Sequence, residues 1–474
     1  MPSILGANTL SSGGYAVDHS LRFNSASSDS LEKTFSSAGN RRTFTMSCWV
    51  KRSSFNSHQR FFGWKNNGGG YGLIWENTDG PDQLRAYIVA SGSNAGFLTN
   101  RKFRDPAAWY HIVLKIDTTQ GTEANRMRLY INGVEETSFE SRTYPNQNEE
   151  THLNLANKCL IGQNPAADNS YLNGYLCEVV FIDGTALDAD SFGEFDEDSE
   201  VWKPIDVSGL TFGQNGFYLE SKGVSTGQNS NGLGADTSGN DHHFATSGFS
   251  AIDRTTDTCT NNFCTINSLD NFYAAATLAE GNLKVTCNAG NTSFITGTFG
   301  LSKGKWYWEG KLTTVGGEEA IGITDKVSTA TDNYAGQTAN SYSFKGNNGN
   351  IRNNDNNSSY GSAYGASVIG VYMDLDNNKL YFAINGTVQA SGAGFDITDP
   401  TSTTNGFYFP MVGDVDSDAP VWEVNFGNPI SALSSAVSDA NGYGSFEYDP
   451  SAGTFDSASK DFYAICTKNL AEYG

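Results

Sequence analysis

The sequence predicts an all-β protein that consists of two antiparallel β-sandwiches in tandem. Of the 474 residues only 17% are charged, whereas 52 are glycine and 12% are aromatic, a composition typical of many short strands joined by turns. Segments such as 44–50 and 111–117 alternate along the chain, so that every second side chain can face one core. No heptad pattern or short β-helical period persists, so a long fibrous shaft is not predicted.

Length and charge limit the possible functions. At ~100–200 residues per domain, 474 residues suggest two or three domains. The 52 acidic and 30 basic residues give a formal charge of 30 − 52 = −22, which repels nucleic-acid phosphates and anionic lipid surfaces. No apolar run approaches the ~18 residues of a membrane span, and the first residues lack the pattern of a signal peptide. We therefore expect no nucleic-acid binding, no membrane insertion and no secretion signal.

Residues 1–220 are predicted to form the first sandwich. The clearest local signal is the segment 127–135, where Asn132 and Gly133 supply the two left-handed positions of a type I′ turn between alternating strands. The segment 187–193 has room for one or two helical turns. No long helix is expected in this half of the chain.

A polar linker is predicted to follow over residues 221–265. It is rich in glycine, serine and asparagine and cannot bury much apolar surface. The second sandwich is then expected over residues 266–435, and residues 436–474 form a C-terminal extension that packs on it.

The second block has strong strand and turn signals of its own. Its first strong strand is expected at 304–312, and its last at 421–427. Between them, tight turns are predicted at Asn377–Asn378 and at Asn385–Gly386, each between two alternating segments.

The strand motifs resemble two related families. In the first block, which spans roughly 15–220, SLRF at 20–23, TMSCWV at 45–50, WYHI at 109–112, YINGV at 130–134 and GYLCEV at 174–179 follow the order of a laminin-G/concanavalin A-like jelly roll. In the second, KWYWE at 305–309, VIGVYMDLD at 368–376, LYFAING at 380–386 and FYFPMV at 407–412 resemble the SPRY domain. The resemblance implies two concanavalin-like antiparallel β-sandwiches (jelly rolls) in tandem, joined by a polar linker.

The domain pair also resembles bacteriophage virion proteins of the tail-fibre or tail-associated kind. Further motifs that carry this resemblance are SFGE at 191–194, VWKP at 201–204, NNFCTINSL at 261–269 and DFYAICTKNL at 461–470. It implies a structural protein of the virion, on tail or capsid, that is assembled in the host cytoplasm. The implied partners are other virion subunits and a host cell-surface glycan or protein, and a homotrimer fits the symmetry common in such assemblies.

The sequence offers no convincing catalytic motif. Concanavalin-like glucan hydrolases carry, by resemblance, Glu-x-Asp-x-x-Glu on a strand, and the nearest segment is 194–200. Its flanks lack strand-forming aliphatic residues, which favours a solvated acidic turn. The six histidines include His111 inside a strand and the pair His242–His243 in the linker, and none belongs to a Ser or Cys nucleophile motif. We therefore expect that the protein is not an enzyme.

The sequence predicts no cofactor apart from one weak calcium candidate. Asp414, Asp416 and Asp418 place three carboxylates at alternate positions, as loops that hold Ca²⁺ often do. The EF-hand pattern is absent, because Ala419 and Asn425 stand where glycine and glutamate would be required. The seven cysteines are odd in number and form no CxxC pair, which favours free thiols over a zinc or redox site.

Two loop regions are candidates for ligand binding, because sandwiches present variable side chains at the ends of rigid strands. Both mix aromatic faces with amides, a composition suited to sugar rings and their hydroxyl groups. The candidates are Trp64, Asn66, Asn67 and Tyr71 in the first sandwich and Tyr342, Asn353, Asp355 and Tyr360 in the second. The alternative is that the four aromatic residues among them belong to the cores.

These observations lead to one functional hypothesis and two alternatives. The hypothesis is a non-enzymatic structural virion protein, a tail fibre or a surface-exposed tail or capsid protein, which uses its sandwich loops for host recognition and virion assembly. The first alternative is a glycan-cleaving depolymerase on a concanavalin-like fold. The second is a purely structural decoration protein of the capsid.

Overall fold

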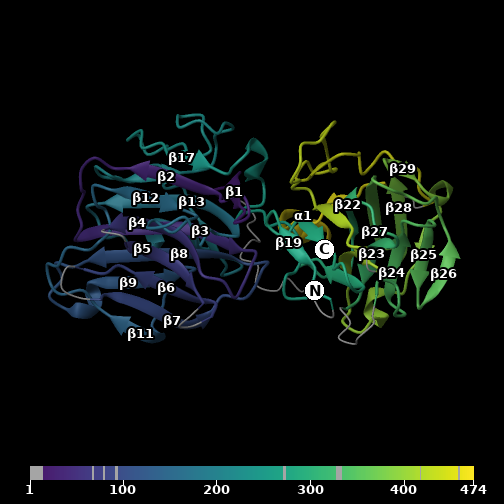
Figure 1. The fold of residues 1–474 in the computed structure, drawn as a ribbon, viewed down its shortest axis with the longest axis horizontal. Coiled ribbons are helices and arrows are strands. Elements are labelled where there is room, and N and C mark those ends of the chain that lie inside the picture. The colour runs from purple at the N-terminus through teal and green to yellow at the C-terminus, as the bar shows by residue number, and fades with distance from the viewer. Residues whose placement is uncertain are drawn as a thin grey trace. The chain divides into compact units, whose positions relative to one another are not determined.

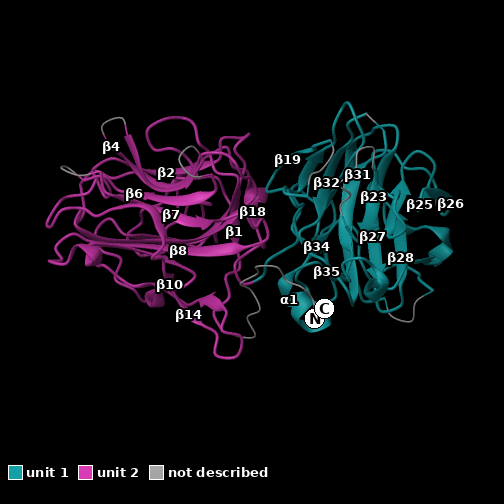
Figure 2. Cartoon of the chain, turned by 90° about the horizontal axis from the view of Figure 1, so that it is seen from below, with its two compact units in different colours: residues 1–7, 261–474 teal, residues 8–260 magenta. Residues whose placement is uncertain are grey.

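The computed structural model describes residues 14–66, 69–77, 81–90, 94–270, 274–326, 334–416, 418–456 and 460–474. The chain divides into a first unit, Asn8–Thr260, and a second unit that contains Asn261–Gly474 (Figure 2). Both are built on antiparallel β-sheets (Figure 1), as the sequence predicted. In the described residues no helix is long and apolar enough to cross a membrane.

The first unit is a sandwich of two antiparallel sheets. One sheet has the order β10 (Val134–Glu135), β9 (Met127–Ile131), β8 (Trp109–Asp117), β3 (Thr43–Arg52), β13 (Gly174–Asp183), β1 (Ser20–Phe23), β18 (Arg254–Thr255), with β16 (Phe217–Leu219) also on β13. The other has the order β11 (Phe139–Thr143), β7 (Gly96–Lys102), β6 (Gln83–Tyr87), β5 (Gly69–Glu76), β4 (Gln59–Asn66), β12 (Lys158–Ile161), β2 (Ser30–Thr34), β17 (Ala245–Ser247). The hairpin of β14 (Gly193–Phe195) and β15 (Trp202–Pro204) and the 3₁₀ turns η1 (Glu123–Asn125), η2 (Ala189–Ser191) and η3 (Ala251–Asp253) complete it.

Strand β3 is buried on both faces, although its alternation suggested a half-buried strand. Met46 and Cys48 face the core between the sheets, while Trp49 faces a second apolar cluster on the outer side of its sheet. The residues 187–212, including Phe192 and Trp202, supply that outer cluster. A segment that returns over a sheet buries its outer face too, which the pattern of one strand does not reveal.

The second unit is also a sandwich of two sheets. Its larger sheet has the order β19 (Thr277–Ala279), β20 (Lys284–Thr286), β32 (Val421–Asn425), β22 (Lys305–Thr314), β27 (Val368–Asp374), β28 (Lys379–Ile384), β29 (Thr387–Val388), with β30 (Phe395–Asp396) on β28 and β35 (Tyr463–Ala464) on β22. Its smaller sheet has the order β21 (Ser293–Thr296), β31 (Phe409–Asp414), β23 (Glu319–Thr324), β24 (Ser341–Lys345), β25 (Asn350–Asn353), β26 (Asn356–Ser359). The hairpin of β33 (Val437–Ser438) and β34 (Ser445–Phe446), the 3₁₀ turns η4 (Ala390–Gly392) and η5 (Pro400–Ser402) and the helix α1 (Thr467–Tyr473) complete it.

The C-terminal segments 436–456 and 460–474 cover the outer face of the larger sheet. Phe446 and Phe462 pack there against Tyr307 and Tyr372, which alternate with the core-facing residues of β22 and β27. Strand β35 pairs in parallel with β22 and fixes this covering segment along the sheet. The same covering segment forms one wall of the pocket that is described below.

The segment predicted as a linker, 221–265, is folded into the two units. Strands β17 and β18 lie within it and pair with β2 and β1 of the first unit. Buried ion pairs fix the same stretch, because Arg22 contacts Asp253 at 3.0 Å and Lys51 contacts Asp257 at 2.8 Å. The division between the units therefore falls at residue 260. The polar composition of this stretch suggested a linker, but its buried acids form ion pairs with basic side chains of the first unit.

The two predicted Asn-Gly turns form as expected, with both of their central residues left-handed. Asn132 and Gly133 have φ values of 49° and 78° between β9 and β10, and Asn385 and Gly386 have φ values of 46° and 77° between β28 and β29. These are type I′ turns, which match the twist of antiparallel strands.

Candidate functional site

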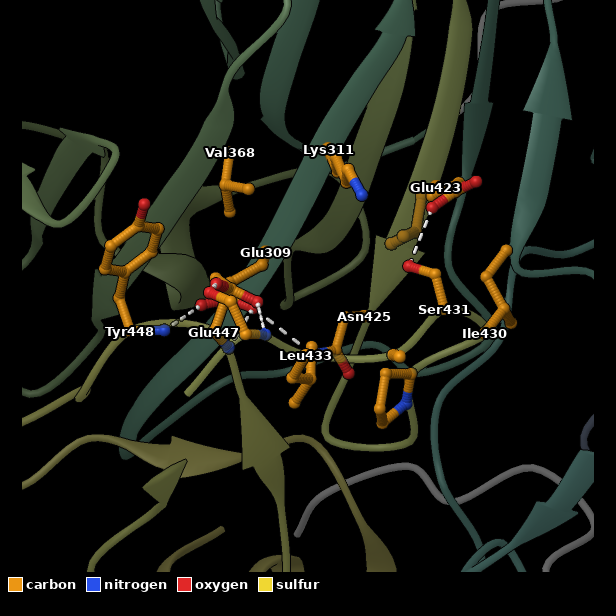
Figure 3. A pocket seen from close by; sticks show the side chains of 14 residues that line it. Glu309, Lys311, Val368, Glu423, Asn425, Ile430, Ser431, Leu433, Glu447 and Tyr448 are labelled. Carbon is orange, nitrogen blue, oxygen red and sulfur yellow. Dashed lines mark hydrogen bonds between the residues drawn. The ribbon is translucent and has the colours of Figure 1, made fainter. Parts of the chain in front are cut away.

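The second unit contains a pocket of about 290 Å³ on the outer face of its larger sheet (Figure 3). Strands β22, β32 and β27 form its floor, and the chain segments 429–434 and 447–448 form its walls. The floor exists because alternate residues of β22 and β32 point away from the core, where Trp308 and Trp422 lie. The outward positions Glu309, Lys311 and Glu423 thereby place charged groups in the pocket.

Glu309 is the deepest acid in the pocket, and its carboxylate is saturated with hydrogen bonds. Its Oε1 accepts from Tyr448 N and from the Tyr307 hydroxyl, both at 2.9 Å. Its Oε2 accepts from Glu447 N at 2.9 Å and from Asn425 Nδ2 at 3.2 Å. Burial raises the pKa of Glu309, although these donors oppose the shift. Glu309 therefore fastens the wall segment 447–448 to the sheet.

Glu423 and Lys311 are two charged groups on the pocket floor that keep free bonding capacity. They lie directly opposite each other on β32 and β22. Glu423 Oε2 accepts a hydrogen bond from Ser431 Oγ at 3.0 Å, which leaves Oε1 to a ligand. Among the described residues Lys311 forms no ion pair, and its side chain is exposed.

The remaining walls supply an aromatic ring, hydroxyl groups and apolar surface. Tyr448 presents its ring to the pocket, and Ser434 binds Glu447 through both its backbone N–H (3.0 Å) and its hydroxyl. The aliphatic lining comes from Val368, Pro429, Ile430 and Leu433. The pocket thus combines a free acceptor, a free donor and a tyrosine around an apolar wall.

The sequence analysis did not find this pocket. A signal was present, because Tyr307, Glu309 and Lys311 occupy alternate positions of β22, while Glu423 and Asn425 do so on β32. Polar residues at every second position of two strands that pair with each other indicate a polar patch on one face of a sheet.

The candidate ligand residues of the first sandwich are divided between core and surface. Trp64 is 0% exposed and packs against Phe181 in the core, so this candidate was wrong as a ligand contact. Tyr71 is half-buried and packs on Tyr87, and Asn66 is half-buried at the end of β4. Asn67 lies outside the described residues.

The candidates of the second sandwich gather around the β25–β26 hairpin, where internal contacts occupy them. Asn353 Nδ2 donates to the carbonyl oxygens of residues 339 and 341, at 2.7 and 3.0 Å. Asp355 is exposed in the turn but accepts from the Tyr334 hydroxyl at 2.7 Å. Tyr360 is half-buried and donates to the carbonyl oxygen of residue 393 at 3.1 Å. Tyr342 is 3% exposed and belongs to the core, so its prediction as a ligand contact was wrong.

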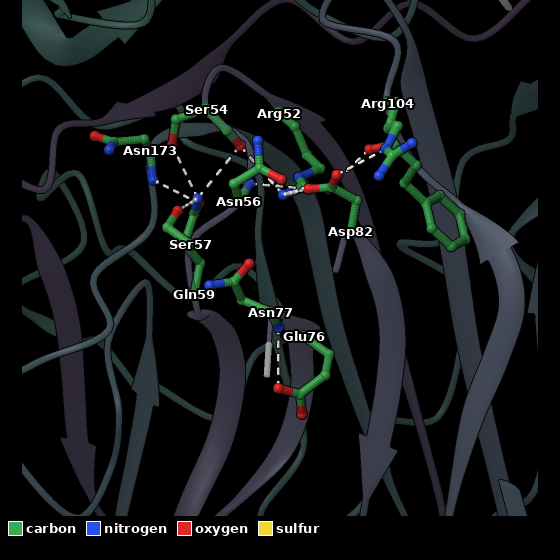
Figure 4. Close-up of polar contacts among 11 residues, drawn as sticks. Arg52, Ser54, Asn56, Ser57, Gln59, Glu76, Asn77, Asp82, Arg104 and Asn173 are labelled. Atoms are coloured by element: carbon green, nitrogen blue, oxygen red, sulfur yellow. Dashed lines mark hydrogen bonds and ion pairs between the residues drawn. The ribbon is translucent and has the colours of Figure 1, made fainter. Parts of the chain in front are cut away.

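A polar cluster at one end of the first sandwich is equally self-contained (Figure 4). Asp82 binds Arg52 at 3.2 Å and Arg104 at 2.8 Å and accepts from Asn56 N at 3.0 Å. Gln59 Nε2 donates to Ser57 Oγ at 2.6 Å, in the loop between β3 and β4. Because these groups mostly bind one another, the cluster fixes loops.

His111 is a core residue in which both ring nitrogens are used. Its ring stacks on Trp49 and Trp202, and its Nδ1 accepts a hydrogen bond from Trp202 Nε1 at 3.0 Å. The proton of the neutral ring is therefore on Nε2, which donates to Ser47 Oγ at 2.9 Å. Burial lowers the pKa of His111 to about 3. A histidine that activates a serine must accept the serine proton, so this pair is not a nucleophile and base.

The acidic segment 194–200 forms the turn between β14 and β15. Asp196 Oδ1 accepts from Asp198 N at 3.2 Å and from Ser199 N at 3.0 Å, and Asp196 Oδ2 binds Lys203 at 3.1 Å. The acids of this segment therefore do not line one face of a strand.

The calcium candidates Asp414, Asp416 and Asp418 lie at the end of β31 and in the loop that follows it. Asp414 is buried, and its Oδ1 accepts from Asp416 N at 3.2 Å. As they stand, no three His, Cys, Asp or Glu side chains in the described part of the chain are placed to hold a metal ion.

Two β-sandwiches with a concanavalin-like architecture define the class of this protein. More particularly, residues 24–191 match a laminin-G-type family model described as the concanavalin A-like lectin/glucanases superfamily, and residues 305–413 match the SPRY domain. The chain therefore carries a concanavalin-like domain and a SPRY domain in tandem.

Two solved structures illustrate the similarity. The crystal structure of the SPRY domain of human HERC1 is 12% identical, over 34% of this chain and 96% of that chain, with a TM-score of 0.28. The stonustoxin structure is 19% identical, over 34% of this chain and 27% of that chain, with a TM-score of 0.26. No curated protein matches this chain significantly in sequence.

Proposed function

We propose that the protein is a non-enzymatic recognition protein that binds a host cell-surface glycan in the pocket of its SPRY domain. The observation that carries the proposal is the pairing of a free acceptor, Glu423, with a free donor, Lys311, across the pocket floor. Sugar hydroxyl groups both donate and accept hydrogen bonds, so one sugar ring can use both groups. The Tyr448 ring and the aliphatic wall suit the apolar face of such a ring.

The saturation of Glu309 favours binding over cleavage. A glycoside hydrolase requires a pair of carboxyl groups, and the acids that line this pocket are Glu309, Glu423 and Glu447. A general acid or base must exchange a proton with the substrate through a free oxygen. Both oxygens of Glu309 already accept two hydrogen bonds each, so Glu309 is not available for this exchange in the depolymerase alternative.

The setting that we propose is a bacteriophage virion, on the tail or capsid surface. Its support is the sequence resemblance carried by the motifs at 191–194, 201–204, 261–269 and 461–470. In this setting the other partners are virion subunits, and the chain assembles in the host cytoplasm as a symmetric oligomer such as a homotrimer. Antibody labelling of purified particles tests the setting, and particles that lack the protein contradict it.

Binding to a glycan array tests the pocket. The variant Glu423→Gln replaces a charged hydrogen-bond acceptor. We expect it to lose roughly 1.5–3 kcal/mol of binding free energy, which corresponds to a roughly 10- to 100-fold weaker affinity for the glycan. The matched control is Asp396→Asn, an exposed acid that forms an ion pair with Lys379 on the surface. Equal binding by Glu423→Gln and the control would contradict the pocket assignment.

A reducing-end assay on the bound polysaccharide separates recognition from cleavage. We expect no release of reducing sugar. Release that Glu309→Gln abolishes would replace the recognition proposal with the depolymerase alternative.

A further inference from the structure

Four acidic side chains gather at one end of the smaller sheet of the second unit, away from the glycan pocket. Glu319 is the first residue of β23, and Asp414 is the last of β31, where the two lie directly opposite each other. Asp416 and Asp418 follow in the next loop. We call Glu319, Asp414, Asp416 and Asp418 the acidic group.

Two oxygens of the acidic group are buried without a hydrogen-bond partner. They are Glu319 Oε2 and Asp414 Oδ2, in residues that are 2% and 0% exposed. A buried carboxylate without a partner is costly, because it has lost its hydration and gained nothing in return. Such an oxygen therefore points to a proton or a cation that satisfies it.

In the part of the chain that the structure describes, no basic side chain neutralises the acidic group. Among the described residues, none of its four members forms an ion pair with lysine, arginine or histidine. Lys345 lies on the adjacent strand β24, but its ammonium group binds Glu318 at 3.1 Å.

The carboxylates of Asp416 and Asp418 converge beside Gly317. A Cβ atom at position 317 would lie 2.2 Å from Asp416 Oδ2 and 2.6 Å from Asp418 Oδ2. These two oxygens therefore meet in a space that exists only because residue 317 has no side chain. The backbone at Gly317 is not left-handed, so its conformation alone does not require glycine.

We propose that the acidic group binds a calcium ion beside Gly317. Calcium takes 6–8 oxygen ligands in flexible geometry, and carboxylates on a loop are its common ligands. Magnesium demands a stricter octahedron, and zinc prefers nitrogen or sulfur ligands, which the acidic group lacks. The four side chains do not yet surround one point, so binding draws the free oxygens of Glu319 and Asp414 toward those of Asp416 and Asp418. The exposed Asp418 gives the ion a path from solvent.

Terbium luminescence tests this proposal on the full chain. Trp422 Nε1 donates to the carbonyl oxygen of Gly413 at 3.2 Å, so an indole that can sensitise bound Tb³⁺ adjoins the acidic group. We expect Tb³⁺ to bind and Ca²⁺ to displace it at concentrations up to ~1 mM. Mg²⁺ at equal concentration should displace it less. Absence of sensitised emission, together with absence of a Ca²⁺-dependent rise in the thermal midpoint, would overturn the proposal.

Two variants locate the site, and neither touches the glycan pocket. Gly317→Ala keeps every charge but fills the converging space, and we expect at least about tenfold weaker Ca²⁺ binding. The control is Gly365→Ala, where an added Cβ meets nothing within 4 Å. Asp416→Asn should raise the thermal midpoint without calcium, because it removes repulsion, and should lose the rise that calcium causes. Unchanged binding by both variants would place the ion elsewhere and overturn the proposal.

Discussion

Glu178 provides a sharp test of the electrostatics of the first unit. It lies at a bulge of β13, where the register shifts between Cys177 and Val180, and it has a left-handed φ of 51°. Its carboxyl group is buried and accepts hydrogen bonds from the hydroxyl groups of Tyr15 (3.2 Å) and Tyr218. Burial is the main cause that raises its pKa from the ordinary value of 4.5 to about 7, against the opposing effect of the tyrosines.

The sign of the effect on stability follows from this direction. Below pH 4.5, Glu178 is protonated in both the folded and the unfolded state and does not reduce the folding stability. As the pH rises from 4.5 to 7, the unfolded state releases its proton first, so the folded state loses stability by about 1.4 kcal/mol per pH unit. Above pH 7 the loss is complete, at about 3 kcal/mol.

Glu178→Gln removes this titration. We expect the variant to be more stable than the parent by up to about 3 kcal/mol at pH 8, less whatever the amide loses in its bonds to the tyrosines. At pH 4.5 this gain should vanish. Urea unfolding at both pH values measures the difference, with Glu123→Gln in the exposed turn η1 as the control. A difference that is the same at both pH values would refute the reasoning.

Three further predictions concern the packing. Trp202→Ala should lower the free energy of unfolding by about 3–5 kcal/mol, because it leaves a cavity and removes the hydrogen-bond donor to His111. Urea unfolding measures this loss, and a loss below ~1 kcal/mol would contradict the prediction. Glu309→Ala should speed hydrogen exchange at the amides of Glu447 and Tyr448, which lose their acceptor, whereas Glu423→Gln should leave these amides unchanged. All seven cysteines are buried free thiols. A thiol reagent should therefore react slowly with the native protein and should label seven groups after denaturation. Fast labelling of the native protein would contradict the burial of the thiols.

The features that the sequence predicted correctly depend on local patterns. Alternating segments such as 111–117 became strands, and the Asn-Gly pairs at 132–133 and 385–386 became type I′ turns, because these depend on adjacent residues. The domain content was also predictable, since the motifs of both families follow in order.

The features that the sequence could not predict depend on which segments meet in space. Trp64 and Tyr342 stand at strand positions where either face could have been exposed, and only the packing of the second sheet decides that they are core. The pocket needs Glu309 and Glu423 on paired strands and a wall from 429–434. The fate of 221–260 depended on buried ion pairs such as Lys51 with Asp257, which its polar composition concealed.

The most direct test of the glycan pocket is a crystal structure of the chain soaked with a sugar that binds on the array. The account predicts density for a sugar ring between Lys311 and Glu423, with its apolar face toward Tyr448. Density at the β25–β26 hairpin or in the first unit, with an empty pocket, would contradict it.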